Sequence, residues 1–136
     1  MLGLKINPRG KDEVAREFRI AVIDDDEPLR TALVEALGSL GYSARGFDSA
    51  EQFVAADATF SWDCVITDIH MPGMSGLDLK RLLVARGSKV PVIMITARSE
   101  PGLEAVAASI GAICLLRKPF DSELLIRCLD KALKAD

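Results

Sequence analysis

The sequence has 136 residues with 49% hydrophobic and 27% charged side chains, which fits one soluble globular domain and leaves little room for a second. The net charge is −3 and no block of Lys and Arg stands out, which argues against nucleic-acid binding by this chain. The apolar runs are short, which argues against a membrane span and a signal peptide, so we expect a cytoplasmic protein that makes no membrane contact.

The first eighteen residues differ in composition from the rest of the chain. They contain Gly3, Pro8 and Gly10, followed by a mixed run of charges. We therefore predict a flexible N-terminal extension over 1–18 and one folded domain over 19–136.

From Arg19 onward, short apolar runs alternate with segments of helical periodicity. The apolar runs predict strands that are buried on both faces, over 20–23, 42–47, 64–67, 92–95 and 113–116. Apolar spacing and capping residues predict helices over 28–40, 50–56, 77–86, 99–110 and 122–133. Five strand–helix units in a row predict an α/β fold, with a doubly wound, five-stranded parallel sheet and helices on both faces.

Two of these helices carry more detailed predictions. The fourth helix is expected to begin at Ser99 or Glu100, because Pro101 suits a first helical turn. The last helix is expected to be capped by Asp121 and to bury Leu124, Leu125, Cys128, Leu129 and Leu133.

Polar residues stand where the predicted strands end. Asp24 and Asp25 follow the first strand, Asp68 the third, Thr96 the fourth, and Lys118 comes shortly after the fifth. The carboxyl ends of strands in open α/β sheets are where ligands bind, near the point at which strand order reverses. We therefore expect these side chains to share one edge of the sheet.

The chemistry of this set points to phosphoryl transfer. Neighbouring carboxylates repel one another unless a cation joins them, and oxygen ligands suit Mg²⁺, with Mn²⁺ as an alternative ion. Asp68 is the candidate nucleophile because carboxylates form aspartyl phosphates. Thr96 and Lys118 could contact the phosphoryl oxygens, on which charge develops during transfer.

Each of these residues alone also has a simpler interpretation. An Asp after a strand is usually a turn or helix-capping residue, and we prefer that interpretation for Asp26 and Glu27. By itself, Thr96 would be a helix-entry residue and Lys118 a surface lysine. His70, the single histidine, is more often a residue at the rim of a site than a proton carrier. The occurrence of acids, a threonine and a lysine together at the ends of four predicted strands favours a functional site.

Four segments resemble the receiver domain of two-component response regulators, and the FixJ-like subgroup in particular. They are VIDDDEPLR (22–30), CVITDIHMPGMSGLDL (64–79), VIMITA (92–97) and LLRKPFD (115–121), and the resemblance covers about 19–135. It implies a flavodoxin-like (CheY-like) fold with strand order 2-1-3-4-5.

The resemblance also implies roles for individual residues at the metal site. By position, Asp68 matches the phosphoacceptor of the family, and Asp24 and Asp25 match the acidic pair that holds Mg²⁺. Asp68 itself and the backbone carbonyl of His70 match the remaining protein contacts to the metal.

Other positions match the residues that sense the phosphoryl group. Thr96 matches the switch hydroxyl and Lys118 the lysine that contacts the phosphoryl group, while the small Ala97 leaves room for access to it. Three residues before the lysine, where the family usually has an aromatic residue for signal coupling, this sequence has Leu115, so we expect phosphorylation to survive and the signal to be weaker or differently routed.

Two further positions match residues that flank the phosphoryl group in the family and tune its lifetime. His70 lies two residues past the acceptor and Arg98 two residues past the switch threonine. Their charges could hold the phosphoryl group electrostatically.

The function implied is a phosphorylation-activated signalling switch rather than a turnover enzyme. Its donor would be a sensor histidine kinase or a phosphotransfer protein, and its response would alter the face formed by the fourth helix and the fifth strand. The resemblance also suggests a phosphorylation-dependent homodimer through that face, and an output domain outside this chain, such as one that regulates transcription.

Three alternatives remain open from the sequence. Leu115 leaves room for a degenerate receiver that acts as a protein-interaction module. A Mg²⁺-dependent phosphatase of the haloacid-dehalogenase type also uses an Asp nucleophile, but its pattern requires an acid two residues later, where this chain has His70. A flavin-binding module requires a phosphate loop after the first strand, and the acidic segment 24–28 would repel phosphate.

Overall fold

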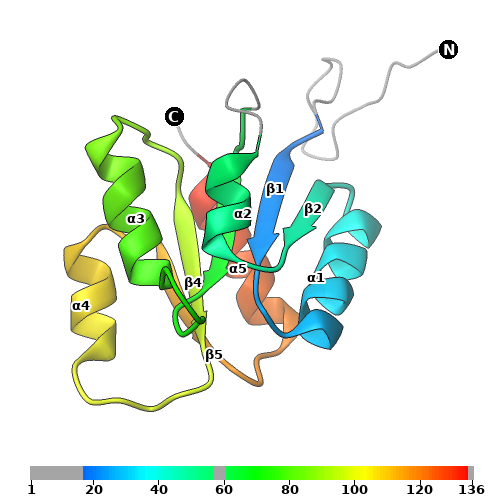
Figure 1. The fold of residues 1–136 in the computed structure, drawn as a ribbon. Coiled ribbons are helices and arrows are strands. Elements are labelled where there is room, and N and C mark those ends of the chain that lie inside the picture. Colours follow the sequence, from blue (N-terminus) through cyan, green and yellow to red (C-terminus); the bar gives the residue numbers. More distant parts are fainter. Residues whose placement is uncertain (1–16, 57–60, 135–136) are drawn as a thin grey trace, which may run out of the picture.

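A computed structural model describes residues 17–56 and 61–134. One sheet of five parallel strands has the order β2-β1-β3-β4-β5 (Figure 1), which confirms the expected topology. The strands are β1 (Arg19–Ile23), β2 (Ser43–Phe47), β3 (Cys64–Asp68), β4 (Val92–Thr96) and β5 (Cys114–Arg117). The helices are α1 (Glu27–Ser39), α2 (Ala50–Ala55), α3 (Gly76–Ala85), α4 (Leu103–Ser109) and α5 (Ser122–Leu133). Within the described ranges, none of these helices combines the length and the apolar character that a membrane crossing requires.

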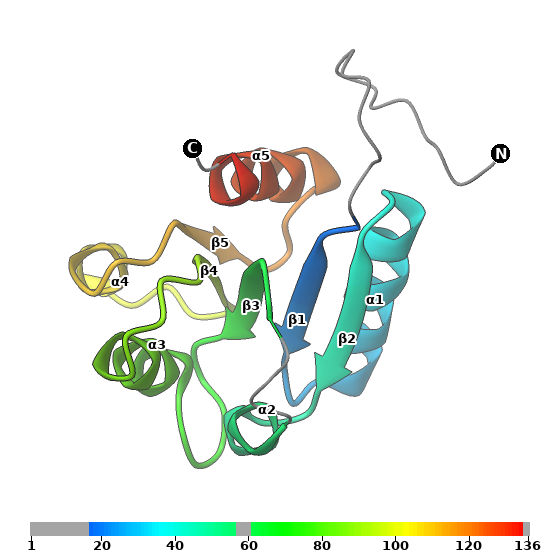
Figure 2. The same ribbon diagram turned by 90° about the horizontal axis from the view of Figure 1, so that it is seen from above.

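Helices cover both faces of the sheet, as predicted. One hydrophobic cluster joins the strands to α1 and α5, and a second cluster joins them to α2, α3 and α4 on the other face (Figure 2). Alternate strand residues serve the two clusters, so that Val22 packs towards α1 and α5 while Ala21 and Ile23 pack on the opposite side. All residues of β3 and β4 are buried. Polar side chains of these central strands therefore reach solvent only near the strand ends.

Local capping explains where most of the helices begin. The side chain of Asp26 accepts a hydrogen bond from the Leu29 amide at the start of α1, which confirms its interpretation as a capping residue. Ser49 caps α2, and Asp121 caps α5 as predicted. At the start of α3, Ser75 and Asp78 form a reciprocal capping box.

The predicted start of α4 is wrong. The helix begins at Leu103 rather than at Ser99 or Glu100. Gly102 has a φ of +82°, a left-handed conformation that a continuous α-helix cannot include. The segment 97–102 is therefore a loop that connects the end of β4 to a short helix.

One residue of the predicted core of α5 is also misplaced. Leu124 is 45% exposed, whereas Leu125, Cys128 and Leu129 are buried and Leu133 is partly buried. The buried positions follow the helical spacing that starts at Leu125. Leu124 lies about 100° away from Leu125 around the helix axis and so points away from the core.

The predicted N-terminal extension lies almost entirely outside the described residues. Its last residue, Phe18, is described, and its carbonyl accepts a hydrogen bond of 2.8 Å from the Ser43 amide of β2. The Phe18 ring also lies 6.4 Å from that of Tyr42, centroid to centroid.

Candidate functional site

The carboxyl ends of β1 and β3 bring three acidic side chains together. One carboxylate oxygen from each of Asp24, Asp25 and Asp68 lies within 4.8 Å of the others. This proximity follows from the parallel pairing of β1 with β3, because both strands end at the same edge. Asp24 and Asp68 are buried, with 1% and 6% exposure, and Asp25 is exposed.

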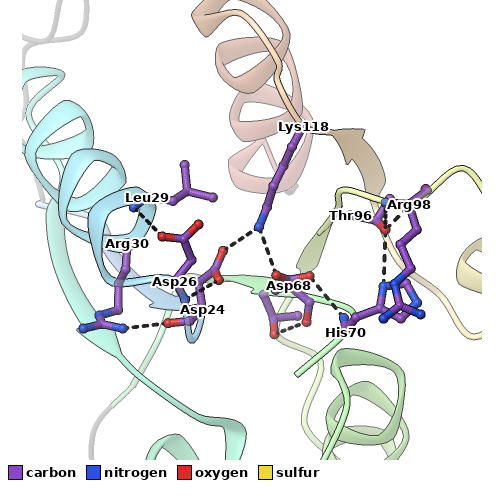
Figure 3. Close-up of polar contacts among 10 residues, drawn as sticks. Asp24, Asp26, Leu29, Arg30, Asp68, His70, Thr96, Arg98 and Lys118 are labelled. Atoms are coloured by element: carbon purple, nitrogen blue, oxygen red, sulfur yellow. Dashed lines mark hydrogen bonds and ion pairs between the residues drawn. The ribbon is translucent and has the colours of Figure 1, made fainter. Parts of the chain in front are cut away.

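Lys118 lies between the two buried acids. Its Nζ is 3.0 Å from Oδ2 of Asp68 and 3.2 Å from Oδ2 of Asp24 (Figure 3). The Lys118 amide donates a hydrogen bond to the Thr96 carbonyl, which ties the lysine to the end of β4. Burial alone would lower the pKa of Lys118, but the hydrogen bond and charge of Asp68, with the charge of Asp24, raise it above the ordinary value. The lysine is therefore a cation at neutral pH.

Asp24 is the most constrained of the acids. Its Oδ1 accepts a hydrogen bond of 2.9 Å from the Asp26 amide, and its backbone carbonyl accepts one of 2.7 Å from Arg30. Its Oδ2 is buried, and its close polar contact is the Lys118 ammonium at 3.2 Å. Burial raises the pKa of Asp24; the Asp26 amide opposes this, and the charge of Asp68 adds to it.

This arrangement fits a divalent cation. Three carboxylates converge beside one ammonium, so negative charge is in excess at this edge of the sheet. Oxygen-only donors suit Mg²⁺, and Mn²⁺ accepts the same donors. The His70 amide donates a hydrogen bond of 3.1 Å to Oδ1 of Asp68, which places the start of the following loop beside the acids. That the backbone carbonyl of His70 contacts the metal stays a prediction.

Thr96 ends β4 on the other side of Asp68, and its side chain is fully buried. Its Oγ1 accepts a hydrogen bond of 3.0 Å from the Arg98 amide and lies 3.4 Å from Nδ1 of His70 (Figure 3). The opposite ring nitrogen of His70, Nε2, lies 3.4 Å from Oε1 of Glu100. The second oxygen of Glu100 lies 3.5 Å from Nη1 of Arg98. The predicted lifetime-tuning residues, His70 and Arg98, thus share one acidic partner.

Sequence reasoning missed two residues of this site. Glu100 lies in the loop before α4, where the sequence predicts a helix, so its partners could not be anticipated. Arg30 carries a stronger signal, since it stands one helical turn into α1 after the acidic segment. Its guanidinium contacts the carbonyl of Asp24 and orients the backbone next to that carboxylate.

The two remaining predicted positions carry apolar side chains and are not members of the acidic cluster. Ala97 is exposed beside Thr96. Leu115 is partly buried and packs against the cluster beneath α2, α3 and α4, and it pairs with Met94 in the sheet. The position expected to carry an aromatic ring is thus filled by an aliphatic side chain in the core.

Comparison with known proteins identifies the family. A family model described as the response regulator receiver domain matches residues 20–130, a range that includes all of these site residues. The chain belongs to this family.

Similar proteins are consistent with the FixJ-like resemblance. The receiver is 37% identical to the transcriptional regulatory protein FixJ of Azorhizobium caulinodans over 84% of this chain and 54% of that protein. It is 34% identical to the transcriptional regulatory protein TdiR of Thauera aromatica over 84% of this chain and 50% of that protein. The crystal structure of FixJ-N superimposes with a TM-score of 0.82 at 29% identity, covering 90% of this chain and 98% of that one. The chain spans about half the length of the curated relatives that it matches.

Replacing Asp24 with Asn should stabilise the receiver in the presence of EDTA. The raised pKa of Asp24 means that its charged form costs folding free energy at pH values above that pKa. Asn removes this charge while its oxygen can still accept from the Asp26 amide. We expect the melting temperature at neutral pH to rise by about 3 °C. The gain should shrink as the pH falls through the folded pKa towards 3.8, the ordinary value.

The same variant tests the metal site. If Asp24 is a metal ligand as predicted, addition of Mg²⁺ should raise the melting temperature of the wild type and leave that of Asp24→Asn unchanged. Thermal denaturation followed by circular dichroism, with and without Mg²⁺, measures both effects. A destabilised variant in EDTA would contradict the electrostatic account of Asp24.

Proposed function

We propose that this receiver is a phosphorylation-activated switch that accepts a phosphoryl group on Asp68 from a sensor histidine kinase or phosphotransfer protein. The observation that carries the proposal is the buried Asp68 carboxylate, held 3.0 Å from the Lys118 ammonium at an edge where two further acids converge. We expect it to act in the cytoplasm, and not as a turnover enzyme.

Asp24, Asp25, Asp68 and the carbonyl of His70 would hold Mg²⁺ or Mn²⁺. The ion supplies positive charge that offsets the charge of the phosphoryl oxygens. An oxygen of Asp68 forms a bond to phosphorus as the bond from phosphorus to the donor nitrogen breaks. The Lys118 ammonium lies where it could leave Asp24 and contact a phosphoryl oxygen. The exposed Ala97 leaves that side of the site open to the donor.

The response would begin at Thr96. A phosphoryl oxygen on Asp68 would compete with His70 for the Thr96 hydroxyl, because a hydrogen bond to a charged oxygen is stronger than the long contact of 3.4 Å. His70 also contacts Glu100, so its release would loosen the loop that leads into α4. This route reaches the face formed by α4 and β5 without an aromatic ring at Leu115.

The consequences beyond this domain follow from the relatives. Those named above are transcriptional regulatory proteins, and the match with this chain spans only 54% and 50% of their lengths, so we propose an output domain outside it. A phosphorylation-dependent homodimer through the α4 and β5 face is a further part of the proposal. Leu115 is the observation that favours the second candidate, a degenerate receiver that binds partners without being phosphorylated.

Intact-mass spectrometry tests the proposal directly. Incubation of the wild type with acetyl phosphate should produce a labile phosphoryl adduct when Mg²⁺ is present, and none when EDTA replaces it. Failure to form the adduct with Mg²⁺ would favour the degenerate receiver. Repeated turnover of a generic phosphate ester would instead favour the phosphatase.

Replacing Arg98 with Ala should change the lifetime of the phosphoryl group without abolishing its formation. Arg98 is 62% exposed and contacts Glu100, so its loss leaves the acids and Lys118 in place. We expect a change of about threefold in the dephosphorylation rate, measured from the decay of the adduct after removal of acetyl phosphate. Arg81→Ala, at another exposed arginine paired with an acid, is the control. Equal lifetimes for wild type and Arg98→Ala would contradict the role.

A further inference from the structure

A glutamate far from the acidic cluster in sequence fastens the loop that leaves β3. Glu51 lies in the first turn of α2, and its Oε2 accepts a hydrogen bond of 2.7 Å from the backbone amide of Met74. This distance is at the short end for an N–H donor, as expected when the acceptor is a charged carboxylate. The contact joins α2 to the tip of the loop between β3 and α3.

The loop between β3 and α3 has space for this carboxylate beside Gly73. Gly73 has a φ of +78°, and a Cβ atom built on it would lie 2.5 Å from Oε2 of Glu51. Glycine at this position thus permits the left-handed turn and also leaves room for the Glu51 side chain. The Glu51 carboxylate therefore lies against both Gly73 and the Met74 amide.

The same loop is fixed at its base beside the acids. The Gly76 amide donates a hydrogen bond of 2.9 Å to the Ile69 carbonyl, and the His70 amide donates one to the Asp68 carboxylate. Met71, with 8% exposure, anchors the first half of the loop in the core beneath α2, α3 and α4. Along the chain, the His70 carbonyl follows this fixed base and precedes the tip that Glu51 holds.

We propose that Glu51 is a positioning residue for the metal site. Its carboxylate holds the loop so that the His70 carbonyl is presented to the ion, although Glu51 is not among the acids that converge there. Outer hydrogen bonds that orient a metal ligand contribute to metal affinity in this way. The inference rests on the proposed function, because it assumes that Mg²⁺ binds at the acidic cluster.

Two variants separate positioning from a general effect of charge. Glu51→Ala removes the charge and the acceptor, whereas Glu51→Gln removes the charge and keeps an oxygen that can accept from Met74. Glu123→Ala is the matched control, because Glu123 is an exposed glutamate in the first turn of α5. Isothermal titration of the unphosphorylated proteins with Mg²⁺ measures the affinities. Amide hydrogen exchange of Met74 in EDTA measures the loop contact itself.

We expect Glu51→Ala to weaken Mg²⁺ binding by about tenfold and to speed exchange of the Met74 amide. Glu51→Gln should lie between Glu51→Ala and wild type in both measurements, and Glu123→Ala should match wild type. At saturating Mg²⁺, Glu51→Ala should form the adduct at the wild-type rate, because the loss is one of metal affinity. If Glu51 had a purely structural role, Glu51→Ala would lower the melting temperature, but it would not weaken Mg²⁺ binding while leaving the rate of adduct formation at saturating Mg²⁺ unchanged.

The outcomes distinguish this inference from the proposed function. Unchanged Mg²⁺ affinity in Glu51→Ala, with a wild type that binds Mg²⁺ and forms the adduct, would overturn the inference alone. Equal affinities for the Ala and Gln variants, both weaker than wild type, would also overturn it, since they would indicate an effect of charge rather than of position. A wild type that does not bind Mg²⁺ would overturn the proposed function and the inference together.

Discussion

Replacing Asp68 with Asn is expected to reduce the phosphoryl adduct by about 100-fold or more, because a neutral amide oxygen is a poor nucleophile. Intact-mass spectrometry after incubation with acetyl phosphate and Mg²⁺ measures the loss. The substitution preserves shape, and an Asn oxygen can accept from the His70 amide as the carboxylate does. The variant also loses a charge partner of Lys118, which leaves that ammonium paired with Asp24.

The interpretation depends on the variant being folded. Its melting temperature in EDTA should be close to that of wild type. The variant loses the charge contact between Asp68 and Lys118, but it also loses the repulsion between the Asp68 and Asp24 carboxylates. Asp48→Asn is the matched control, since Asp48 is an exposed acid just beyond the end of β2, at the same edge of the sheet. It should form the adduct normally. An equally abundant adduct on Asp68→Asn would show that the acceptor is another residue.

Replacing Gly76 with Ala is expected to destabilise the fold by about 3 kcal/mol, which corresponds to roughly 10 °C in melting temperature for a domain of this size. A Cβ atom at Gly76 would lie 2.4 Å from the backbone carbonyl oxygen of Asp68 and 3.0 Å from Cα of Ile69. Both are backbone atoms at the end of the central strand, so neither can move aside without disturbing β3. Urea denaturation followed by circular dichroism measures the change.

A second glycine provides the control. Gly38 lies in α1, and a Cβ atom there would have nothing within 4 Å. Gly38→Ala should therefore stabilise the domain by about 0.5–1 kcal/mol, because alanine is the better helix former. If Gly76→Ala were as stable as wild type, the close approach of α3 to β3 would not be a requirement of the fold.

The sheet and the acidic cluster could be predicted because local patterns determine them. Continuous apolar runs mark buried parallel strands, and polar residues at their carboxyl ends must share an edge once the strands pair. The caps at Asp26 and Asp121 were predictable for a similar reason, since each cap contacts backbone only a few residues away.

The parts that could not be predicted depend on loop conformation and on distant contacts. Pro101 suits a helix start, but the left-handed Gly102 delays α4, and the loop that results carries Glu100 to His70. The sequence marks Gly73 as a turn residue without indicating that Glu51, in another element, fills the space beside it. Such pairings arise only when separate units of the fold pack together.

The position of Lys118 bears on how the site would return to its unphosphorylated, metal-free state. Its ammonium pairs with both buried acids, so the protein supplies an internal counter-ion before a divalent cation arrives. The metal binding that we propose would then be an exchange of counter-ions, and its net free energy would be the difference between two sets of charge contacts. In the proposed cycle, the internal pairing would limit metal affinity, and it would also reduce the repulsion between the neighbouring carboxylates after the phosphoryl group and the metal leave. In the proposed cycle, the Lys118 side chain would therefore return to a pairing that the protein itself supplies.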